Sequence, residues 1–248
     1  MISLKSPAEM ESMRAAGKVV GSLLKAIAAE VRPGRTTRDL DKFAEDFIRK
    51  AGAEPAFKGY CGFPATICVS VNEEVVHGIP GKRALKEGDI VGVDVGAKVN
   101  GLYADAARTF AVGHTEMVRQ KLIDVAREAL RAGIAEAVPG KRISDISNAV
   151  QKHVEKHGFS VVRNYVGHGI GTQLHEEPQV PNFGGPNKGP LIRAGMALAI
   201  EPMVNAGTHE VTLDKDGWTV RTKDGKPSSH FEDTILIREG KTEVLTDA

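Results

Sequence analysis

Apolar residues recur at helical intervals along the start of the chain, at Met10, Met13, Val19, Leu23 and Ile27. Ser6, Pro7 and Glu9 precede this run in the order of a capping box with proline at the first helical position. The pattern predicts an amphipathic helix that begins after Ser6 and continues until Pro33-Gly34 ends it.

The same periodicity predicts three more helices and a series of strands. A second helix is expected from Thr37 to Ala51, before Gly52. Two further helices are expected over 115–137 and 144–157, separated by Pro139-Gly140. Extended segments rich in β-branched residues are expected near 66–71, 90–95, 102–112, 159–165, 196–204, 217–221 and 229–237.

The two helix pairs align with each other at an offset of 106 residues. This alignment gives 9 identities over the 29 positions from 24 to 52, including Pro33-Gly34 on Pro139-Gly140. With the offset increased by one residue, the predicted strand 88–94 aligns with 195–201, and Asp94 aligns with Glu201. We interpret this as two related α/β halves, roughly 1–112 and 113–248, with joined sheets and a site between them. Coincidental Pro-Gly helix ends are the alternative.

Composition narrows the class of protein. The 248 residues carry 33 Lys and Arg against 32 Asp and Glu, and this balance argues against a nucleic-acid or anionic-membrane surface. No apolar run approaches the ~20 residues of a membrane span, and the start has no signal-peptide core. Two cysteines are too few for a disulfide framework. We expect one cytoplasmic domain over 1–248, with no membrane association and no stable nucleic-acid binding.

Two carboxylates interrupt apolar strands in the first half of the chain. The segment 90–110 reads as a hairpin, and a four-residue loop over 98–101 would place Asp94 directly opposite Asp105. Like charges in that position are destabilising. A fold tolerates them if the two residues face solvent, share a proton or bind a cation.

The second half supplies three further metal-ligand candidates. Glu201 ends one apolar strand, Glu232 precedes another, and His168 lies in a predicted glycine-rich turn. Four carboxylates balance two divalent cations, and one imidazole completes a ligand set that favours Mn²⁺, Fe²⁺, Co²⁺ or Zn²⁺. Two such ions ~3.5–4 Å apart can share a bridging water as the nucleophile.

With these residues in view, the chain resembles the type I methionine aminopeptidases of the short bacterial form over essentially its whole length. The matching runs are GYCGFPATICVSVNEEVVHGIP (59–80), GDIVGVDVGAKVNGLYADAARTF (88–110), YVGHGIGTQLHEEPQVPNFG (165–184), GMALAIEPMV (195–204), DGWTVRTKDG (216–225) and HFEDTILI (230–237). The resemblance implies the pseudo-two-fold "pita-bread" α/β (α+β) fold. Its two related halves share a central antiparallel sheet with helices packed on the outer face.

The resemblance also implies the roles of the metal ligands. The implied ligands are Asp94, Asp105, His168, Glu201 and Glu232, with Asp105 and Glu232 bridging both ions. Glu201 would also be the proton shuttle. The implied cofactors are therefore two divalent ions per chain, of Co, Mn, Fe(II) or Zn.

Further roles follow from the same resemblance. His175 would polarise the scissile carbonyl, and His77 would face the substrate amide. A pocket for the methionine side chain would be formed by Tyr60, Phe63, Cys68 and Trp218.

The implied reaction is removal of the initiator methionine from the N-terminus of nascent proteins when the second residue is small. A metal-bridged water would attack the scissile carbonyl. The implied partners are N-terminal Met peptides and nascent chains, with transient ribosome contact as one candidate, and we expect a monomer.

Two alternative functions stay open from the residues alone. One is a pita-bread hydrolase that cleaves before proline, although such enzymes usually carry an additional N-terminal domain and only 93 residues precede Asp94. The other is a binding protein that has lost catalysis, which we expect to lack one or more of the ligands.

One further motif, HVEKH, places His153 and His157 at the i,i+4 spacing of a zinc-binding helix. The position of the general-base glutamate in H-E-x-x-H holds Val154 here. We therefore interpret both histidines as surface or helix-end residues.

Overall fold

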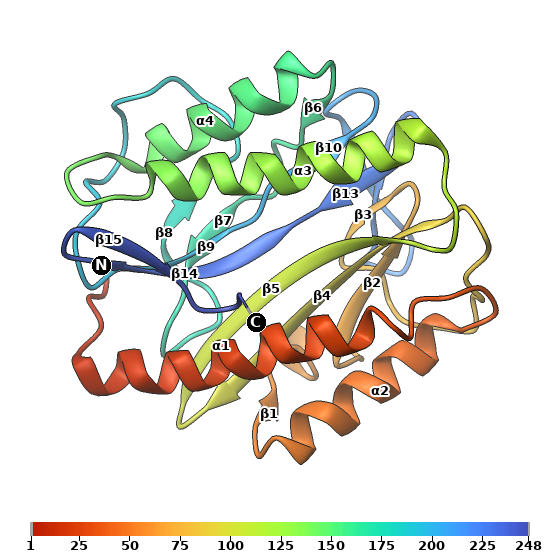
Figure 1. Cartoon of the computed structure of the whole chain (residues 1–248), viewed down its shortest axis with the longest axis horizontal. Helices are drawn as coiled ribbons and strands as arrows, with labels where there is room; N and C mark the ends of the chain where they lie inside the picture. Colours follow the sequence, from red (N-terminus) through yellow and green to blue (C-terminus); the bar gives the residue numbers. More distant parts are fainter. Residues whose placement is uncertain (1, 248) are drawn as a thin grey trace.

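The computed structural model describes residues 2–247, and the helices of this part of the chain form two pairs (Figure 1). They are α1 (Pro7–Ile27), α2 (Thr37–Lys50), α3 (Met117–Glu136) and α4 (Ile143–Lys156). In Figure 1 the first pair lies below the centre of the molecule and the second pair above it. The starts of all four agree with the sequence predictions to within two residues.

The capping box predicted at the start of α1 is present, but the predicted end of this helix is wrong. The Ser6 hydroxyl accepts from Glu9 N–H, and the Glu9 carboxylate accepts from Ser6 N–H at 2.7 Å. The helix ends at Ile27 rather than at Pro33-Gly34. After Ile27 the backbone changes from the α-helical hydrogen-bond pattern to the tighter 3-10 pattern, in which each N–H bonds to the carbonyl oxygen three residues earlier. The bond from Glu30 N–H to Ile27 O, at 2.9 Å, is an example.

Within residues 2–247 the strands form one sheet of nine and two sheets of three. The large sheet has the order β1-β4-β5-β14-β9-β7-β8, with β2 beside β4 and β15 beside β14. Its neighbouring strands are antiparallel. The small sheets are β13-β10-β6 and β11-β12-β3.

The strand bounds are β1 (Glu54–Pro55), β2 (Ile67–Val71), β3 (Glu74–Val76), β4 (Ile90–Val99), β5 (Leu102–Ala111), β6 (Ser160–Val161), β7 (Gly167–Gly169), β8 (Glu176–Val180), β9 (Ala197–Ile200), β10 (Met203–Asn205), β11 (Val211–Leu213), β12 (Val220–Thr222), β13 (Ser228–His230), β14 (Glu232–Arg238) and β15 (Lys241–Val244). A short 3-10 turn spans Tyr60–Gly62.

The β4–β5 hairpin has a different register from the one predicted. Val99 pairs with Leu102, so the loop is the two residues Asn100-Gly101, both with positive φ. Asn-Gly is the favoured sequence for such a two-residue turn, so the predicted four-residue loop is wrong. Asp94 therefore opposes Ala107 rather than Asp105. The two carboxylates lie diagonally on the same face, because a shift of two residues preserves the side of the sheet.

Equivalent hydrogen bonds confirm the two related halves. In the first half, Gly34 N–H donates to Leu85 O at 2.8 Å, and in the second half Gly140 N–H donates to Ile192 O at 3.1 Å. Both glycines have φ near 90°, where a side chain would be strained. The halves meet where β5 pairs with β14 at the centre of the large sheet.

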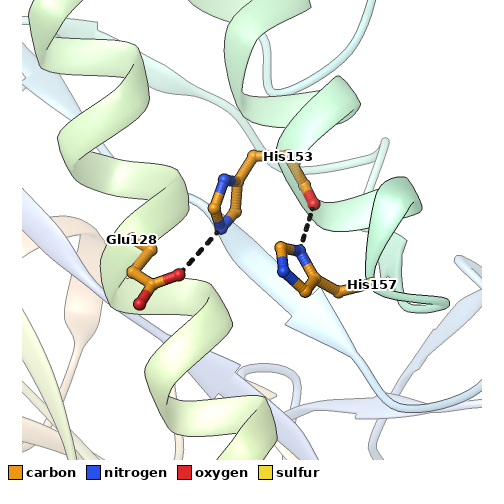
Figure 2. Close-up of side chains that lie close together, drawn as sticks. All are labelled: Glu128, His153 and His157. Carbon is orange, nitrogen blue, oxygen red and sulfur yellow. Dashed lines mark hydrogen bonds and ion pairs between the residues drawn. The ribbon is translucent and has the colours of Figure 1, made fainter.

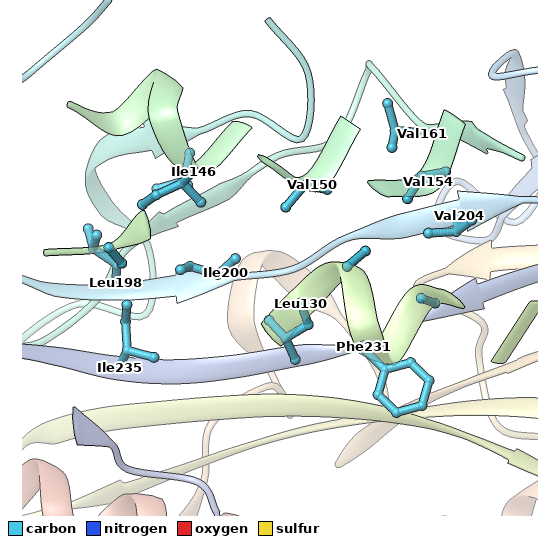
Figure 3. Packing of buried hydrophobic residues seen from close by; sticks show 14 of the residues in the cluster. Leu130, Ile146, Val150, Val154, Val161, Leu198, Ile200, Val204, Phe231 and Ile235 are labelled. Atoms are coloured by element: carbon cyan, nitrogen blue, oxygen red, sulfur yellow. The ribbon is translucent and has the colours of Figure 1, made fainter. Parts of the chain in front are cut away.

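Each half buries its own hydrophobic cluster between its helix pair and the sheet. In the second half, Leu130 of α3 and Val150 of α4 pack over Ile200 of β9 and Ile235 of β14 (Figure 3). A Cβ at Gly133 would lie 2.9 Å from Val150 Cγ2, so glycine permits the close approach of α3 and α4. Among the described residues, no helix has both the length and the apolar character to cross a membrane.

Candidate active site

Five side chains converge where the central strands of the large sheet meet. Asp94 lies on β4, Asp105 on β5, His168 on β7 and Glu232 at the start of β14, while Glu201 directly follows β9. They line one cavity of about 150 Å³. The other predicted site residues line the same cavity, namely Tyr60, Phe63, Cys68, His77, His175 and Trp218. The structure thus brings together every site residue predicted from the sequence.

The imidazole of His168 has the geometry of a metal ligand. Its Nδ1 lies 2.9 Å from the carbonyl oxygen of Gly169, so Nδ1 must be the donor, and in the neutral ring Nε2 keeps its lone pair. Nε2 lies 3.5 Å from Asp105 Oδ2, 3.8 Å from Glu201 Oε1 and 4.0 Å from Glu232 Oε1. Two donors on one first-row cation are at most about 4.3 Å apart, so these separations fit a shared ion.

Four ionised carboxylates buried this close together are unfavourable without cations to balance their charge. Asp105 and Glu232 are each only 3% exposed, and Asp94 Oδ1 is buried without a hydrogen-bond partner among residues 2–247. Burial, followed by repulsion from the neighbouring carboxylates, raises the pKa of Asp94 and Glu232 well above the ordinary values. Burial also raises the pKa of Asp105 and Glu201. Divalent cations would remove this cost.

Thr234 on β14 holds Asp105 in position. Its hydroxyl lies 2.9 Å from Asp105 Oδ1 and 2.8 Å from Asp105 O, and it accepts from Asp105 N–H at 3.0 Å. Such partners orient a ligand and tune its affinity for metal. Sequence reasoning missed this residue, although it is two positions after Glu232 and therefore on the same side of β14.

His168 lies in a strand rather than in the predicted glycine-rich turn. A Cβ at Gly167 would lie 2.4 Å from Ala199 O, and a Cβ at Gly169 would lie 2.2 Å from Glu177 O. The glycines flanking His168 therefore allow β7 to pack between β8 and β9. The close approach that these glycines permit is between the backbones of neighbouring strands.

Two further histidines border the metal-ligand cluster. His77 follows β3 with a φ of 60°, and its ring packs edge-on against Tyr165 and Trp218. His175 lies beside His168, with ring centroids 4.3 Å apart, and its Nδ1 lies 2.8 Å from the Tyr60 hydroxyl. Burial lowers the pKa of both His77 and His175 to about 4, so both are neutral at pH 7.

The rest of the cavity is apolar. Phe63 and Trp218 pack edge to face with ring centroids 5.1 Å apart. Cys68 lies opposite Asp94 in the β2–β4 pair, and burial raises the pKa of its thiol well above the ordinary value. Phe57 and Leu174 also line this wall and were missed by sequence reasoning.

His230 is a second missed neighbour of the cluster. Its Nε2 lies 3.6 Å from Glu201 Oε2 and is buried without a hydrogen-bond partner in the described part of the chain. Burial lowers its pKa to about 3, so the ring is neutral at pH 7. The sequence signal that could have indicated His230 is its position two residues before Glu232.

A curled sheet of two related halves, with carboxylates and one imidazole converging at its centre, defines a metal-dependent hydrolase. The model of metallopeptidase family M24 matches residues 11–239. The chain belongs to this family.

Similar proteins span the same length. The chain is 53% identical over 246 residues to methionine aminopeptidase 1 of Bacillus subtilis, covering 99% of each, and likewise 53% identical to a methionine aminopeptidase of Clostridium perfringens. The crystal structure of methionine aminopeptidase from Thermotoga maritima matches all of both chains with a TM-score of 0.99 and 49% identity. A prolidase from Pyrococcus furiosus, at 22% identity and a TM-score of 0.81, shares the fold.

Proposed function

We propose that this chain removes N-terminal methionine from peptides and nascent chains whose second residue is small. The observation that carries the proposal is the convergence of Asp94, Asp105, His168, Glu201 and Glu232 in one cavity with the predicted side-chain pocket. Similarity to methionine aminopeptidases over 99% of the chain gives the substrate class.

The proposed cofactors are two divalent cations, of Co, Mn, Fe(II) or Zn, held by those five residues. Asp105 and Glu232 are the proposed bridging ligands, and both come from the central strands β5 and β14. When bound, such cations supply Lewis acidity and lower the pKa of water.

Glu201 is the proposed proton shuttle. It follows β9, its side chain keeps 14% of its surface exposed, and Asn182 Nδ2 holds its carbonyl oxygen at 2.9 Å. A carboxylate in this position can take a proton from the attacking water and pass it to the leaving amine.

His175 is the proposed hydrogen-bond donor to the scissile carbonyl. If the Tyr60 hydroxyl donates to Nδ1, the proton of the neutral ring is on Nε2, where it can stabilise the developing oxyanion. Tyr60 thus orients His175 in addition to its proposed place in the pocket. His77, whose ring packs against Trp218 in the same cavity, is proposed to face the substrate amide.

The apolar wall is proposed to hold the unbranched methionine side chain. Phe63 and Trp218 both line the cavity and pack edge to face with each other, and contact of a thioether with aromatic rings is favourable. Tyr60 and Cys68 complete the proposed pocket.

We further propose one catalytic unit over 1–248, with halves 1–112 and 113–248, that acts as a cytoplasmic monomer and contacts the ribosome transiently. The sheet shared by both halves supports the single unit. A single chain supplies all five proposed ligands, which is consistent with a monomer.

The experiment that tests the function is release of methionine from Met-X-Ser peptides, with X as Gly, Ala, Pro, Leu or Phe, in each of Co²⁺, Mn²⁺, Fe²⁺ and Zn²⁺. We expect rapid release when X is small, slow release when X is large, and none after chelation. Release that does not depend on metal, or cleavage confined to peptides with proline at X, would contradict the proposal.

A further inference from the structure

A second cluster of metal-ligating side chains lies on the outer helices, away from the active-site cavity (Figure 2). His153 is on α4, His157 caps the end of the same helix, and Glu128 faces them from α3. None of these three residues lines the active-site cavity. The sequence interpretation of the two histidines as surface or helix-end residues is correct in position, but the spacing could not show that Glu128 lies opposite them.

His157 has the hydrogen bond that prepares an imidazole for metal. Its Nδ1 lies 2.8 Å from the carbonyl oxygen of His153, so Nδ1 must be the donor and Nε2 keeps its lone pair in the neutral ring. Backbone carbonyls commonly fix metal-binding histidines in this way. His168 in the active-site cluster has the same arrangement with Gly169.

His153 presents a buried nitrogen without a hydrogen bond. Its Nε2 atom is out of contact with solvent and has no hydrogen-bond partner among residues 2–247. It lies 3.3 Å from Glu128 Oε2. Two donors of one tetrahedral ion, each about 2.1 Å from the metal, are about 3.4 Å apart, so this pair already has the separation of two ligands.

We propose that Glu128, His153 and His157 form a binding site for a divalent transition-metal ion, with Zn²⁺ as the reference ion. One donor atom from each residue lies within 4.8 Å of the other two, and the Glu128 side chain is 54% exposed and free to close the remaining gap. Two imidazole nitrogens and one carboxylate suit Zn²⁺, Ni²⁺ or Cu²⁺ and disfavour Mg²⁺ and Ca²⁺. Three protein ligands leave a fourth position open to water or to a donor from a partner.

The site links the two helices of the second half. Glu128 is in the middle of α3, whereas the histidines are in the last turn of α4, so a bound ion would join them where α4 ends. The adjacent surface pocket is lined by Lys121, Asp124, Glu128 and His157, and Lys121 Nζ also holds the carbonyl oxygen of His157 at 3.2 Å. Metal binding would therefore stabilise the folded state, because the unfolded chain does not hold these donors together.

The test compares Zn²⁺ binding by three full-length proteins that share the same active site. Wild type, His153→Ala and the control His114→Ala, which removes an exposed histidine elsewhere, are dialysed against the same Zn²⁺ series and their metal content is measured. We expect wild type and His114→Ala to bind one more Zn²⁺ per chain than His153→Ala. We also expect Zn²⁺ to raise the melting temperature of wild type by more than that of His153→Ala.

Glu128→Gln provides a second variant at a half-exposed position where folding is not at risk. We expect its affinity for the additional Zn²⁺ to be at least ~10-fold lower than that of wild type, the size of the loss when even an outer partner of a ligand is removed. Equal Zn²⁺ content in wild type, His153→Ala and Glu128→Gln would overturn the proposal. So would an additional site that Mg²⁺ fills as readily as Zn²⁺.

Discussion

The hydrogen bond between Tyr60 and His175 determines which nitrogen of His175 is available in the candidate active site. The two side chains are 115 positions apart in the sequence, and their polar atoms are 2.8 Å apart in the fold. A histidine that is neutral and whose Nδ1 is occupied can act through only one remaining nitrogen. The proposed role of His175 therefore belongs to its Nε2 atom, and it differs from the role proposed for the metal ligands.

Replacement of His175 tests this role directly. We predict that His175→Ala lowers kcat for a Met-Ala-Ser peptide by ~10²-fold or more, the typical cost of losing an oxyanion donor. Metal content, measured on the same preparation, should stay at the wild-type level. Tyr60→Phe is the matched variant, and its kcat should fall less because the imidazole remains. Loss of metal from His175→Ala would show that the residue is a ligand instead.

At the scale of the element, the packing of β7 positions His168. This strand is three residues long and lies between β8 and β9, which leaves no room for a side chain at Gly169. A methyl group there would lie 2.2 Å from the carbonyl oxygen of Glu177, which is backbone and cannot rotate away. The strand would have to shift, and His168 would shift with it.

A pair of glycine substitutions separates the displacement of β7 from the loss of stability that replacing any glycine by alanine can cause. We predict that Gly169→Ala destabilises the fold by about 1–3 kcal/mol, as overpacking typically does, and weakens metal binding. Gly185→Ala is the control, because a Cβ there meets nothing within 4 Å. Urea unfolding and metal titration measure the two effects. Wild-type stability and metal affinity in Gly169→Ala would contradict this account of β7.

The helices and strands differ in how well the sequence predicts them. The helices were predictable because their periodicity and capping residues are local. The hairpin register was within reach, since Asn100-Gly101 is the preferred two-residue turn, but the assumed loop length gave the wrong partner for Asp94. The strand around His168 was not predictable, because its three residues, two of them glycines, carry no periodicity and the strand exists only through its neighbours.

At the scale of the whole molecule, one ion pair joins the beginning of the chain to its end. Arg14 of α1 donates from Nε and Nη2 to the two carboxylate oxygens of Glu243 on β15, at 2.7 and 2.8 Å. The hydrogen bonds from Arg14 lower the pKa of Glu243 below its ordinary value of 4.5. A carboxyl group with a lowered pKa stabilises the fold above its unfolded pKa, and this contribution is lost as the pH falls through the folded value.

This ion pair predicts a pH-dependent stability difference. We expect Glu243→Gln to lower the free energy of unfolding at pH 7 by up to about 1 kcal/mol, since the pair is bidentate but partly exposed. The difference from wild type should shrink as the pH falls below 4.5, because Glu243 is then protonated first in the unfolded state and, at lower pH, in the folded state as well. Urea unfolding across this range measures it, with the exposed Glu239→Gln as control. A difference that grows toward acid pH would contradict the prediction.

The two-fold organisation of the molecule was visible in the sequence because equivalent helix ends keep the same residues. Gly34 and Gly140 share a φ near 90° and bond to equivalent carbonyls, so the repeat reflects a shared backbone requirement. The site residues could be proposed because each occurs in a recognisable motif. Thr234 and His230 lie in one of these motifs, two positions from Glu232, but the sequence does not show their contacts with Asp105 and Glu201, which join distant segments. The Tyr60–His175 bond also joins distant segments, and no motif indicates it.

We propose that the cluster around Asp105 holds cations and that the cations are required to release methionine. The most direct measurement is metal-dependent release of Met from Met-Ala-Ser by wild type and by Asp105→Ala, with metal content determined on both proteins. We predict that Asp105→Ala loses metal and has no detectable release at any metal concentration that supports wild type. Full activity of Asp105→Ala would contradict it.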